Sequence, residues 1–286
     1  MTFKLLTDST ADLPQEWIAQ HDVDVVGLTI QLDGVSYETA GQHAISTPEL
    51  LNKMRAGEQP TTSQVNVGQF EEYFRQAAED SQAVLYMAFS SVLSGTYQSS
   101  VIARDLVLED YPDAQIILMD TLAASCGEGY LVTQAERLRA EGATVSQVVD
   151  WVEDRLPRLR TFFLVDDLYH LMRGGRLSKA SALVGSLVNI KPLLWLDATG
   201  KLVPLAKSRG RKRAMKEMVE RATDQLGDST AIVAYADDDQ AAQELKESLL
   251  AIPEITEVLV WPLGPVISAH VGPGTLAVFT FGREAR

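Results

Sequence analysis

Apolar runs of strand length alternate with segments of helical hydrophobic spacing through most of this 286-residue sequence. In the first half this pattern predicts strands at 3–7, 23–32, 83–89 and 115–119. It predicts helices at 70–78, 95–108, 129–139 and 144–156, and a further helix capped by Thr47 with Pro48 in its first position. A repeated strand–helix order indicates a mainly parallel sheet with helices on both faces.

The second half, after Pro157, has a different order of elements. We predict strands at 161–165, 192–196, 201–207 and 230–236 and near Val258 and Leu276, with helices from about Arg211 and at 240–250. The strands at 192–196 and 201–207 are expected to form a hairpin, so this sheet is mixed. We therefore expect an α/β fold of two domains, at 1–160 and 161–286.

Charge and cysteine content exclude several classes of protein. The net charge of −14 argues against the basic face that nucleic-acid binding needs, so we expect no nucleic-acid partner. Cys126 is the single cysteine, so neither an internal disulfide nor a cysteine zinc site can form, which favours a reducing, cytoplasmic location. The four histidines lack metal-binding spacing, and we predict no metal.

The segment 258–282 contains no Asp, Glu, Lys or Arg and has nearly the length of a membrane span. Three prolines and four glycines interrupt it, a density of helix breakers that a bilayer helix rarely tolerates. We predict two buried strands with an intervening loop, and no transmembrane segment. The N-terminus reaches Asp8 before any long apolar region develops, so we also expect no signal peptide.

Three loops rich in hydroxyl groups are candidate ligand sites. The loop after the 83–89 strand holds Ser94, the loop at 60–64 holds Thr62 and Ser63, and the loop after the first strand holds Ser9. Ligands of open α/β sheets bind beyond the carboxyl ends of strands, and hydroxyls with free N–H groups suit a carboxylate or phosphate. The plainer interpretation is that these side chains cap helices, as serine often does.

His270 and two groups of basic residues are further candidates. His270 lies between apolar strands in a segment of glycines and a proline that could hold its ring in one orientation, although such a histidine is usually just partly buried. Arg173 and Arg176 flank a Gly-Gly turn, which could cradle a phosphate or present an arginine to a partner. The basic cluster at 207–213 stands against the acidic charge of the chain and suggests electrostatic docking or an anion site.

A catalytic interpretation is also open. Segment 123–127 resembles a nucleophile elbow whose first glycine is replaced by alanine, and Ser125, Asp237 and His270 occur in the order of an α/β-hydrolase. No oxyanion motif of that fold accompanies them. The sequence also lacks a P-loop, and Gly127-Glu128-Gly129 lacks the third glycine of a dinucleotide site.

Several of these segments together resemble the DegV family over essentially the whole chain. In order along the sequence they are 8–14, 60–64, 91–99, 120–121, 173–178, 189–192 and 270–275. The resemblance implies a two-domain α/β protein of bacterial type that binds a long-chain fatty acid such as palmitate, in a slot that the second domain, 161–286, closes. Its carboxylate would be held by Thr62, Ser94 and His270, with Ser9, Ser63 and Gly95 as additional ligand-loop residues.

The resemblance also implies a role without catalysis by the chain itself and without a cofactor. Such proteins present the bound acid to a separate fatty-acid kinase subunit, and the acyl phosphate then feeds phospholipid synthesis. Arg173 matches a family arginine that works with the kinase, and Arg209 matches a second one less closely, since Lys207 and Arg211 are its neighbours. A transient contact with a membrane is compatible with this role.

The chemistry of these residues agrees with such a ligand. Burying an acyl chain yields about 0.8 kcal/mol per methylene, or about 10 kcal/mol gross for a dozen methylenes. An unpaired carboxylate would cancel much of that gain, so the head group needs donors. We expect the hydroxyls of Thr62 and Ser94 to supply them without a fixed cation in the site, and a protonated His270 would strengthen the network.

Overall fold

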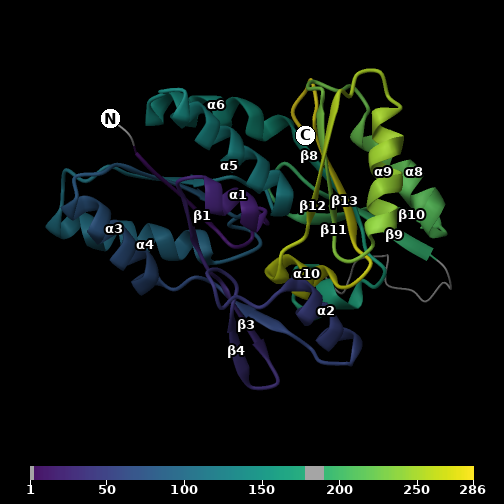
Figure 1. Cartoon of the computed structure of the whole chain (residues 1–286), viewed down its shortest axis with the longest axis horizontal. Helices are drawn as coiled ribbons and strands as arrows, with labels where there is room; N and C mark the ends of the chain where they lie inside the picture. The colour runs from purple at the N-terminus through teal and green to yellow at the C-terminus, as the bar shows by residue number, and fades with distance from the viewer. Residues whose placement is uncertain (1–2, 178–189) are drawn as a thin grey trace.

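The computed structural model describes residues 3–177 and 190–286. Its first sheet, sheet A, is parallel and four-stranded, in the order β2 (Val23–Val26), β1 (Lys4–Asp8), β6 (Val84–Ala88) and β7 (Ile116–Asp120). The helices α3 (Val67–Glu79) and α4 (Thr96–Asp110) cover one face, and α5 (Ser125–Ala140) and α6 (Val145–Arg155) cover the other (Figure 1). The parallel sheet flanked by helices is confirmed.

The second sheet, sheet C, has six strands. Their order is β10 (Leu202–Arg209), β9 (Ile190–Leu196), β8 (Leu159–Leu164), β13 (Leu276–Phe281), β11 (Thr230–Tyr235) and β12 (Glu257–Pro262). The β11–β12 pair is parallel and the other pairs are antiparallel, so the sheet is mixed, as predicted. Its outer face is covered by α8 (Arg211–Ala222) and α9 (Asp239–Leu250), which lie on the right of Figure 1.

The strand predicted at 23–32 is wrong as a single element. Residues 23–26 form β2 in sheet A, whereas β3 (Thr29–Leu32) belongs to a small antiparallel sheet with β4 (Val35–Glu38) and β5 (Thr61–Ser63). The chain leaves sheet A at Gly27, where a Cβ would lie 3.2 Å from the backbone of Ala40. The hydroxyl of Ser9 then accepts the N–H of Leu28 at 3.0 Å, in place of a ladder hydrogen bond.

Two helix details also differ from the prediction. The helix α2 (Thr47–Arg55) is capped by Ser46, whose hydroxyl accepts the N–H of Glu49 at 3.3 Å. Thr47 is already inside the helix, and its hydroxyl donates to the carbonyl of Leu263 at 2.9 Å. The segment 258–282 contains the two expected strands, but the intervening loop holds α10 (Pro265–Val271), so His270 lies on a helix.

The remaining short elements are α1 (Gln15–Gln20), η1 (Leu156–Arg158) and α7 (Tyr169–Arg173). Ser178 and Asn189, which belong to the segments that carry the family resemblance, lie outside the described residues. In the part of the chain that the structure describes, no helix combines the length and apolar character that crossing a bilayer requires.

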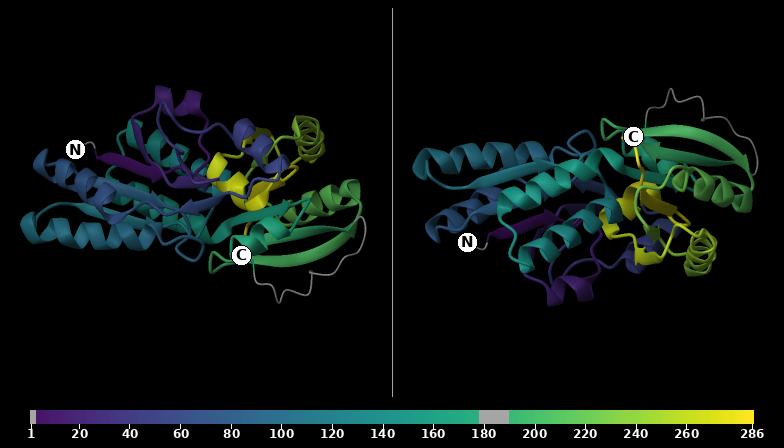
Figure 2. Two further views of the ribbon diagram at one scale, coloured as in Figure 1. Left: turned by 90° about the horizontal axis from the view of Figure 1, so that it is seen from below. Right: turned by 90° about the horizontal axis from the view of Figure 1, so that it is seen from above.

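One core joins the two sheets, and α5 lies between them. A Cβ at Gly127 would approach the Phe279 ring to 2.7 Å, and one at Gly129 would approach the Ala11 carbonyl to 2.2 Å, so both glycines permit close packing. The same core includes Leu5 of sheet A and Ile232 of sheet C. Figure 2 shows α10, in yellow, at the junction of the two sheets. The division into domains at 1–160 and 161–286 stays a prediction.

Candidate functional site

A cavity of about 820 Å³, counting all space between its walls and its mouth, lies between sheet C and the carboxyl edge of sheet A. One wall is the inner face of sheet C, including Phe163 and Phe279. The opposite wall contains loops that follow three parallel strands, with Thr10 after β1, Phe89 after β6 and Ser125 after β7. This is the edge of sheet A at which the sequence predicted a ligand site.

The cavity lining is mostly apolar. Its apolar residues are Leu28, Phe89, Leu93, Ala124, Phe163, Leu171, Leu196, Leu202, Leu263, Val266, Ile267, Val271, Ala277 and Phe279. A small hydrophobic cluster of Phe89, Leu93, Ala124 and Leu196, separate from the main cores, belongs entirely to this lining. Such a lining suits a hydrocarbon chain, because apolar side chains offer water no hydrogen bonds.

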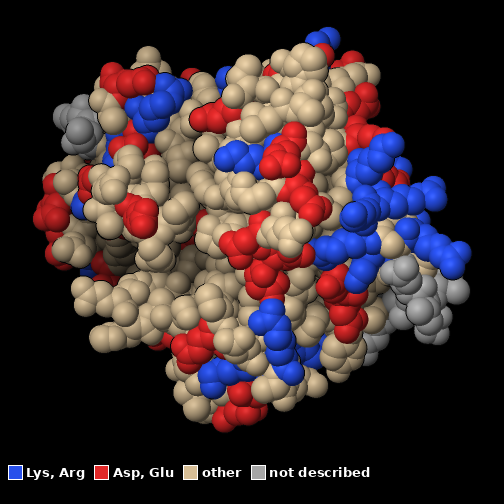
Figure 3. All heavy atoms as spheres, turned by 45° about the vertical axis from the view of Figure 1, so that its right-hand side comes forward, with Lys and Arg blue, Asp and Glu red and all other residues tan. Residues whose placement is uncertain are grey.

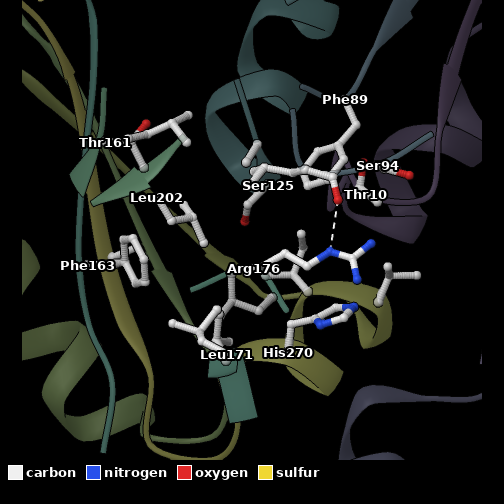
Figure 4. A pocket seen from close by; sticks show the side chains of 18 of the residues that line it. Thr10, Phe89, Ser94, Ser125, Thr161, Phe163, Leu171, Arg176, Leu202 and His270 are labelled. Carbon is white, nitrogen blue, oxygen red and sulfur yellow. Dashed lines mark hydrogen bonds between the residues drawn. The ribbon is translucent and has the colours of Figure 1, made fainter. Parts of the chain in front are cut away.

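The lining includes the polar side chains of Thr62, Ser94, Arg176 and His270, and we call this part of the cavity its polar end. Figure 4 shows the Arg176 guanidinium between His270 and Ser94. The lining also has polar side chains at Thr10, Gln64, Ser125, Thr161 and Thr275. The Thr62 hydroxyl and the Nε2 atom of His270 are hydrogen-bonded at 2.8 Å, although 208 positions separate the two residues. The structure therefore brings together Thr62, Ser94 and His270, which the sequence singled out from three separate segments.

Ser94 is not the cap of α4, whose N-cap is Gly95 without a side-chain capping bond. It is buried, and its hydroxyl accepts the N–H of Thr96, the first residue of α4, at 3.2 Å. The same hydroxyl lies 2.9 Å from the Thr96 hydroxyl and lines the cavity. Its hydrogen can turn toward a ligand acceptor.

His270 is neutral at physiological pH in this arrangement. Burial lowers its pKa to about 4, and the positive charges of Arg176 and Arg173 act in the same direction. A neutral imidazole has one donor nitrogen and one acceptor nitrogen. His270 can therefore serve as a hydrogen-bond partner, but it does not supply the positive charge that the sequence interpretation considered.

The expectation of a site without a fixed cation is wrong, because Arg176 lines the cavity. Its Nε donates to the Leu93 carbonyl at 2.9 Å (dashed line in Figure 4), and Nη1 donates to the Gly174 carbonyl at 2.6 Å. The Arg-Gly-Gly-Arg segment was recognised in the sequence as a possible anion cradle. Nothing in its pattern tells which of the two arginines faces the cavity.

The three additional ligand-loop residues lie outside the cavity lining. Ser63 is exposed, because neighbouring residues of a strand point to opposite faces and Thr62 takes the inward face of β5. The Ser9 hydroxyl is hydrogen-bonded to the Thr39 hydroxyl at 2.7 Å, and it accepts the N–H of Leu28 just after β2. Gly95 borders an outer groove, and a Cβ there would lie 2.1 Å from the amide oxygen of Gln64, which lines the cavity.

The two predicted partner arginines have different surroundings. Arg173, at the end of α7, is half-buried, and its Nη1 donates to the Pro60 carbonyl at 2.8 Å, next to the Thr62 strand. Arg209 is exposed at the end of β10. Three more exposed basic residues, Lys212, Arg213 and Lys216, follow it on α8. Figure 3 shows a group of Lys and Arg side chains on the right of the molecule.

The hydrolase alternative is not assembled in the structure. The Ser125 hydroxyl donates to Asp12 at 2.6 Å, and Nε2 of His270 is engaged by Thr62. Asp237 accepts the N–H of Gly274 at 2.7 Å and forms an ion pair with Arg55. No hydrogen bond in the described chain links any two members of the proposed triad, so Ser125 lacks the histidine base that the triad requires.

Three fully buried carboxyl groups lie behind the cavity wall, and we call Asp8, Asp12 and Glu128 the buried acid cluster. Asp8 accepts Tyr86 Oη at 2.7 Å, Thr10 Oγ1 at 2.5 Å and the N–H groups of Thr10 and Phe89 at 3.0 and 3.4 Å. Burial raises the pKa of all three, that of Asp12 to about 8. The sequence interpretation missed this cluster and took the segment at 8–10 for a loop.

The chain is similar to known proteins over nearly its full length. A family model described as "Uncharacterised protein, DegV family" matches residues 2–283. A DegV domain-containing protein of Streptococcus pyogenes is 59% identical, with 100% of both chains covered. The solved structure titled fatty acid binding of a DegV family protein, from Thermus thermophilus, has a TM-score of 0.87 and 34% identity, covering 99% of this chain and 100% of that one.

A further solved structure is described by the ligand it carries. It is a stearic acid-binding protein from Eubacterium ventriosum, with a TM-score of 0.85 and 25% identity, covering 97% of this chain and 98% of that one. The match to the family model, over residues 2–283, therefore includes both sheets.

Proposed function

The chain belongs to the DegV family, and on that premise we propose that its cavity binds a long-chain fatty acid whose carboxylate lies against Thr62, Ser94 and His270. The observation that carries this proposal is the hydrogen-bonded pair of Thr62 and His270 in a cavity whose lining is mostly apolar. Among the described residues, the other polar groups of the lining are hydroxyls and one amide, and Arg176 is its one permanently charged side chain. A fatty acid likewise combines an apolar chain with one polar head.

The energetics favour this ligand over a wholly polar one. Each methylene that leaves water contributes about 0.8 kcal/mol, so a dozen methylenes contribute about 10 kcal/mol before ordering costs. A head group buried without donors would lose several kcal/mol of this gain. The hydroxyls of Thr62 and Ser94 offset that loss, since each can donate to a carboxylate oxygen.

Native mass spectrometry of freshly purified protein tests the proposal directly. We expect an adduct with the mass of a long-chain fatty acid, and recovery of that acid after extraction. Delipidated protein should take up added palmitate or oleate with one-to-one stoichiometry. A clean ligand-free mass together with no binding of either added acid would refute the proposal.

We further propose that the chain presents its ligand to a separate kinase subunit in the cytoplasm and does no chemistry on it itself. Arg173 supports this, because its guanidinium lies beside the strand that carries Thr62 without lining the cavity. The exposed Arg209 and its basic neighbours offer a docking surface to an acidic partner, in a chain whose net charge is −14.

Variants of the two arginines separate lipid binding from presentation. Arg173→Ala is expected to keep palmitate affinity within about twofold and to lower the rate at which the cognate kinase phosphorylates the bound acid by at least about tenfold. Arg209→Ala should weaken kinase binding, with a salt dependence typical of charge pairs. Equal phosphorylation rates for wild type and Arg173→Ala would remove Arg173 from this role.

A further inference from the structure

Arg176 occupies a boundary between the cavity and the surface. Leu93, Ser94 and Arg176 line the cavity and also an outer groove that contains Gly175 and the exposed Lys201. The Arg176 side chain extends from the turn after α7 toward the polar end of the cavity, beside His270 (Figure 4). A molecule that enters the cavity with its head group outermost would therefore place that head group next to this guanidinium.

The charge of Arg176 has no acidic partner in the described chain. No Asp or Glu of the described residues lines the cavity, and desolvation is the one influence acting on the pKa of Arg176, which it lowers. His270, its neighbour, is neutral and does not compensate the charge. A half-buried cation without an anion is a costly arrangement unless a ligand completes it.

Arg176 also has N–H donors that no described residue accepts. A guanidinium has five N–H donors in a planar fork, and the structure uses Nε for Leu93 and Nη1 for Gly174. Both of these acceptors are backbone carbonyls, which fix the side chain but leave its charge uncompensated. No described residue takes a hydrogen bond from the Nη2 group or the second Nη1 hydrogen, and both can donate to an oxygen acceptor in the cavity.

We infer that Arg176 is the counter-charge of the ligand head group, so that the cavity selects ionised amphiphiles over uncharged ones of the same chain length. This inference rests on the proposed function and deepens it by naming the chemical property on which the site discriminates. Thr62, Ser94 and His270 alone would supply hydrogen bonds to an alcohol or an ester as well as to a carboxylate. Arg176 adds an interaction that requires a negative charge.

A purely structural role for Arg176 makes a different prediction. Its two hydrogen bonds hold the loop that contains Leu93, so loss of the side chain could loosen the cavity wall. In that case charged and uncharged ligands would lose affinity by the same factor. A counter-charge role weakens the charged ligand selectively, and the ratio of the two affinities separates the two roles.

The experiment compares the affinities of delipidated protein for palmitate and for 1-hexadecanol, in the wild type, Arg176→Gln, Arg176→Lys and Lys201→Gln. We expect the wild type to prefer palmitate by at least about tenfold, and Arg176→Gln to reduce this preference by about tenfold through weaker palmitate binding. Arg176→Lys should recover part of it. Lys201→Gln removes the same charge from the exposed rim and should change the ratio by less than about twofold.

A second readout works on the wild type without any substitution. The carboxyl carbon of bound [1-¹³C]palmitate reports its ionisation by NMR, and an adjacent guanidinium should keep the bound acid ionised to about 1 to 3 pH units below its ordinary range. Titration in the ordinary range, or an unchanged affinity ratio in Arg176→Gln, would overturn the role of Arg176. Failure of wild-type protein to bind palmitate at all would instead refute the proposed function.

Discussion

The polar end of the cavity and the buried acid cluster are both groups of polar side chains enclosed by apolar packing, yet their hydrogen bonds are completed in different ways. In the acid cluster, the acceptors of Asp8 receive four donors from Tyr86, Thr10 and Phe89, all within the chain. At the polar end, Thr62 and His270 share one bond, and among the described residues Arg176 keeps N–H groups without a partner. The hydrogen bonds of Asp8 are thus completed within the chain, whereas the polar end has capacity for an external acceptor.

This difference indicates which polar residues stabilise the fold and which bind a ligand. A buried group whose partners belong to the chain is costly to remove, because its partners are left unsatisfied. A group that faces a cavity can be replaced at smaller cost to the fold and larger cost to affinity. Burial alone does not separate the two kinds of residue, since Ser94 and Asp8 are both buried.

The largest effect is expected in the acid cluster. Asp8→Ala should lower the free energy of unfolding by about 3 to 4 kcal/mol, because four donors lose their acceptor in a buried site. Urea unfolding measures the change. Tyr86→Phe, which removes one of the four bonds, serves as a control with an expected loss of about 1 kcal/mol. A loss below that of the control would show that Asp8 is not the principal acceptor of the cluster.

The two regions should also respond to pH with opposite signs, and His270 gives the first of these responses. The pKa of His270 is about 4 in the folded protein and 6.5 in the unfolded reference, so the unfolded chain binds more protons between these values. Stability is therefore complete above pH 6.5 and falls as the pH drops toward 4, by up to about 1.4 kcal/mol per pH unit. Unfolding of delipidated His270→Gln should lack this acid slope.

Asp12 gives the opposite response. Its pKa is about 8 in the folded protein against 3.8 in the unfolded reference, so the folded chain binds more protons between these values. Its contribution is complete below pH 3.8 and is lost as the pH rises through 8, again by up to about 1.4 kcal/mol per pH unit. Asp12→Asn should flatten this part of the stability curve while leaving the acid slope of His270 in place. Identical curves for Asp12→Asn and wild type would place the Asp12 pKa near its ordinary value.

A smaller effect is expected at the polar end of the cavity. Thr62→Val keeps the shape of the side chain but removes the hydroxyl that bonds His270, and should weaken palmitate binding about tenfold, or about 1.4 kcal/mol. Calorimetric titration measures the affinity. Thr61→Val is a matched control, because Thr61 is the exposed neighbour on the same strand. Equal affinities for the two variants would show that the head group lies elsewhere.

Much of the fold could be predicted because both sheets are built from short apolar runs that turn signals separate. The predictions failed where one residue changes the direction of the chain. Gly27 divides one apolar run between two sheets, which no periodicity reveals. The helix α10 has seven residues between glycines and prolines, so its sequence resembles a loop.

The site was predictable only in part, for a similar reason. Sequence spacing carries no information about a hydrogen bond across 208 positions, and the pairing of Thr62 with His270 rested on resemblance to a family. The inward orientation of Arg176 rather than Arg173 depends on carbonyl groups of two different loops. The hydrogen bonds of Asp8 join two distant segments of the chain, at 8–10 and 86–89, so no local pattern marks them.

The smallest effects are expected at Ser125, which lines the cavity and contacts the buried acid cluster. Its hydroxyl lines the cavity but donates to Asp12 at 2.6 Å, so the comparison assigns it to the acid cluster. Ser125→Ala should lower the free energy of unfolding by about 1 kcal/mol and change palmitate affinity by less than about threefold. Neither form should hydrolyse a nitrophenyl ester. A large loss of affinity with unchanged stability would instead make Ser125 part of the ligand site, and the boundary between the two regions would then lie between Ser125 and Asp12.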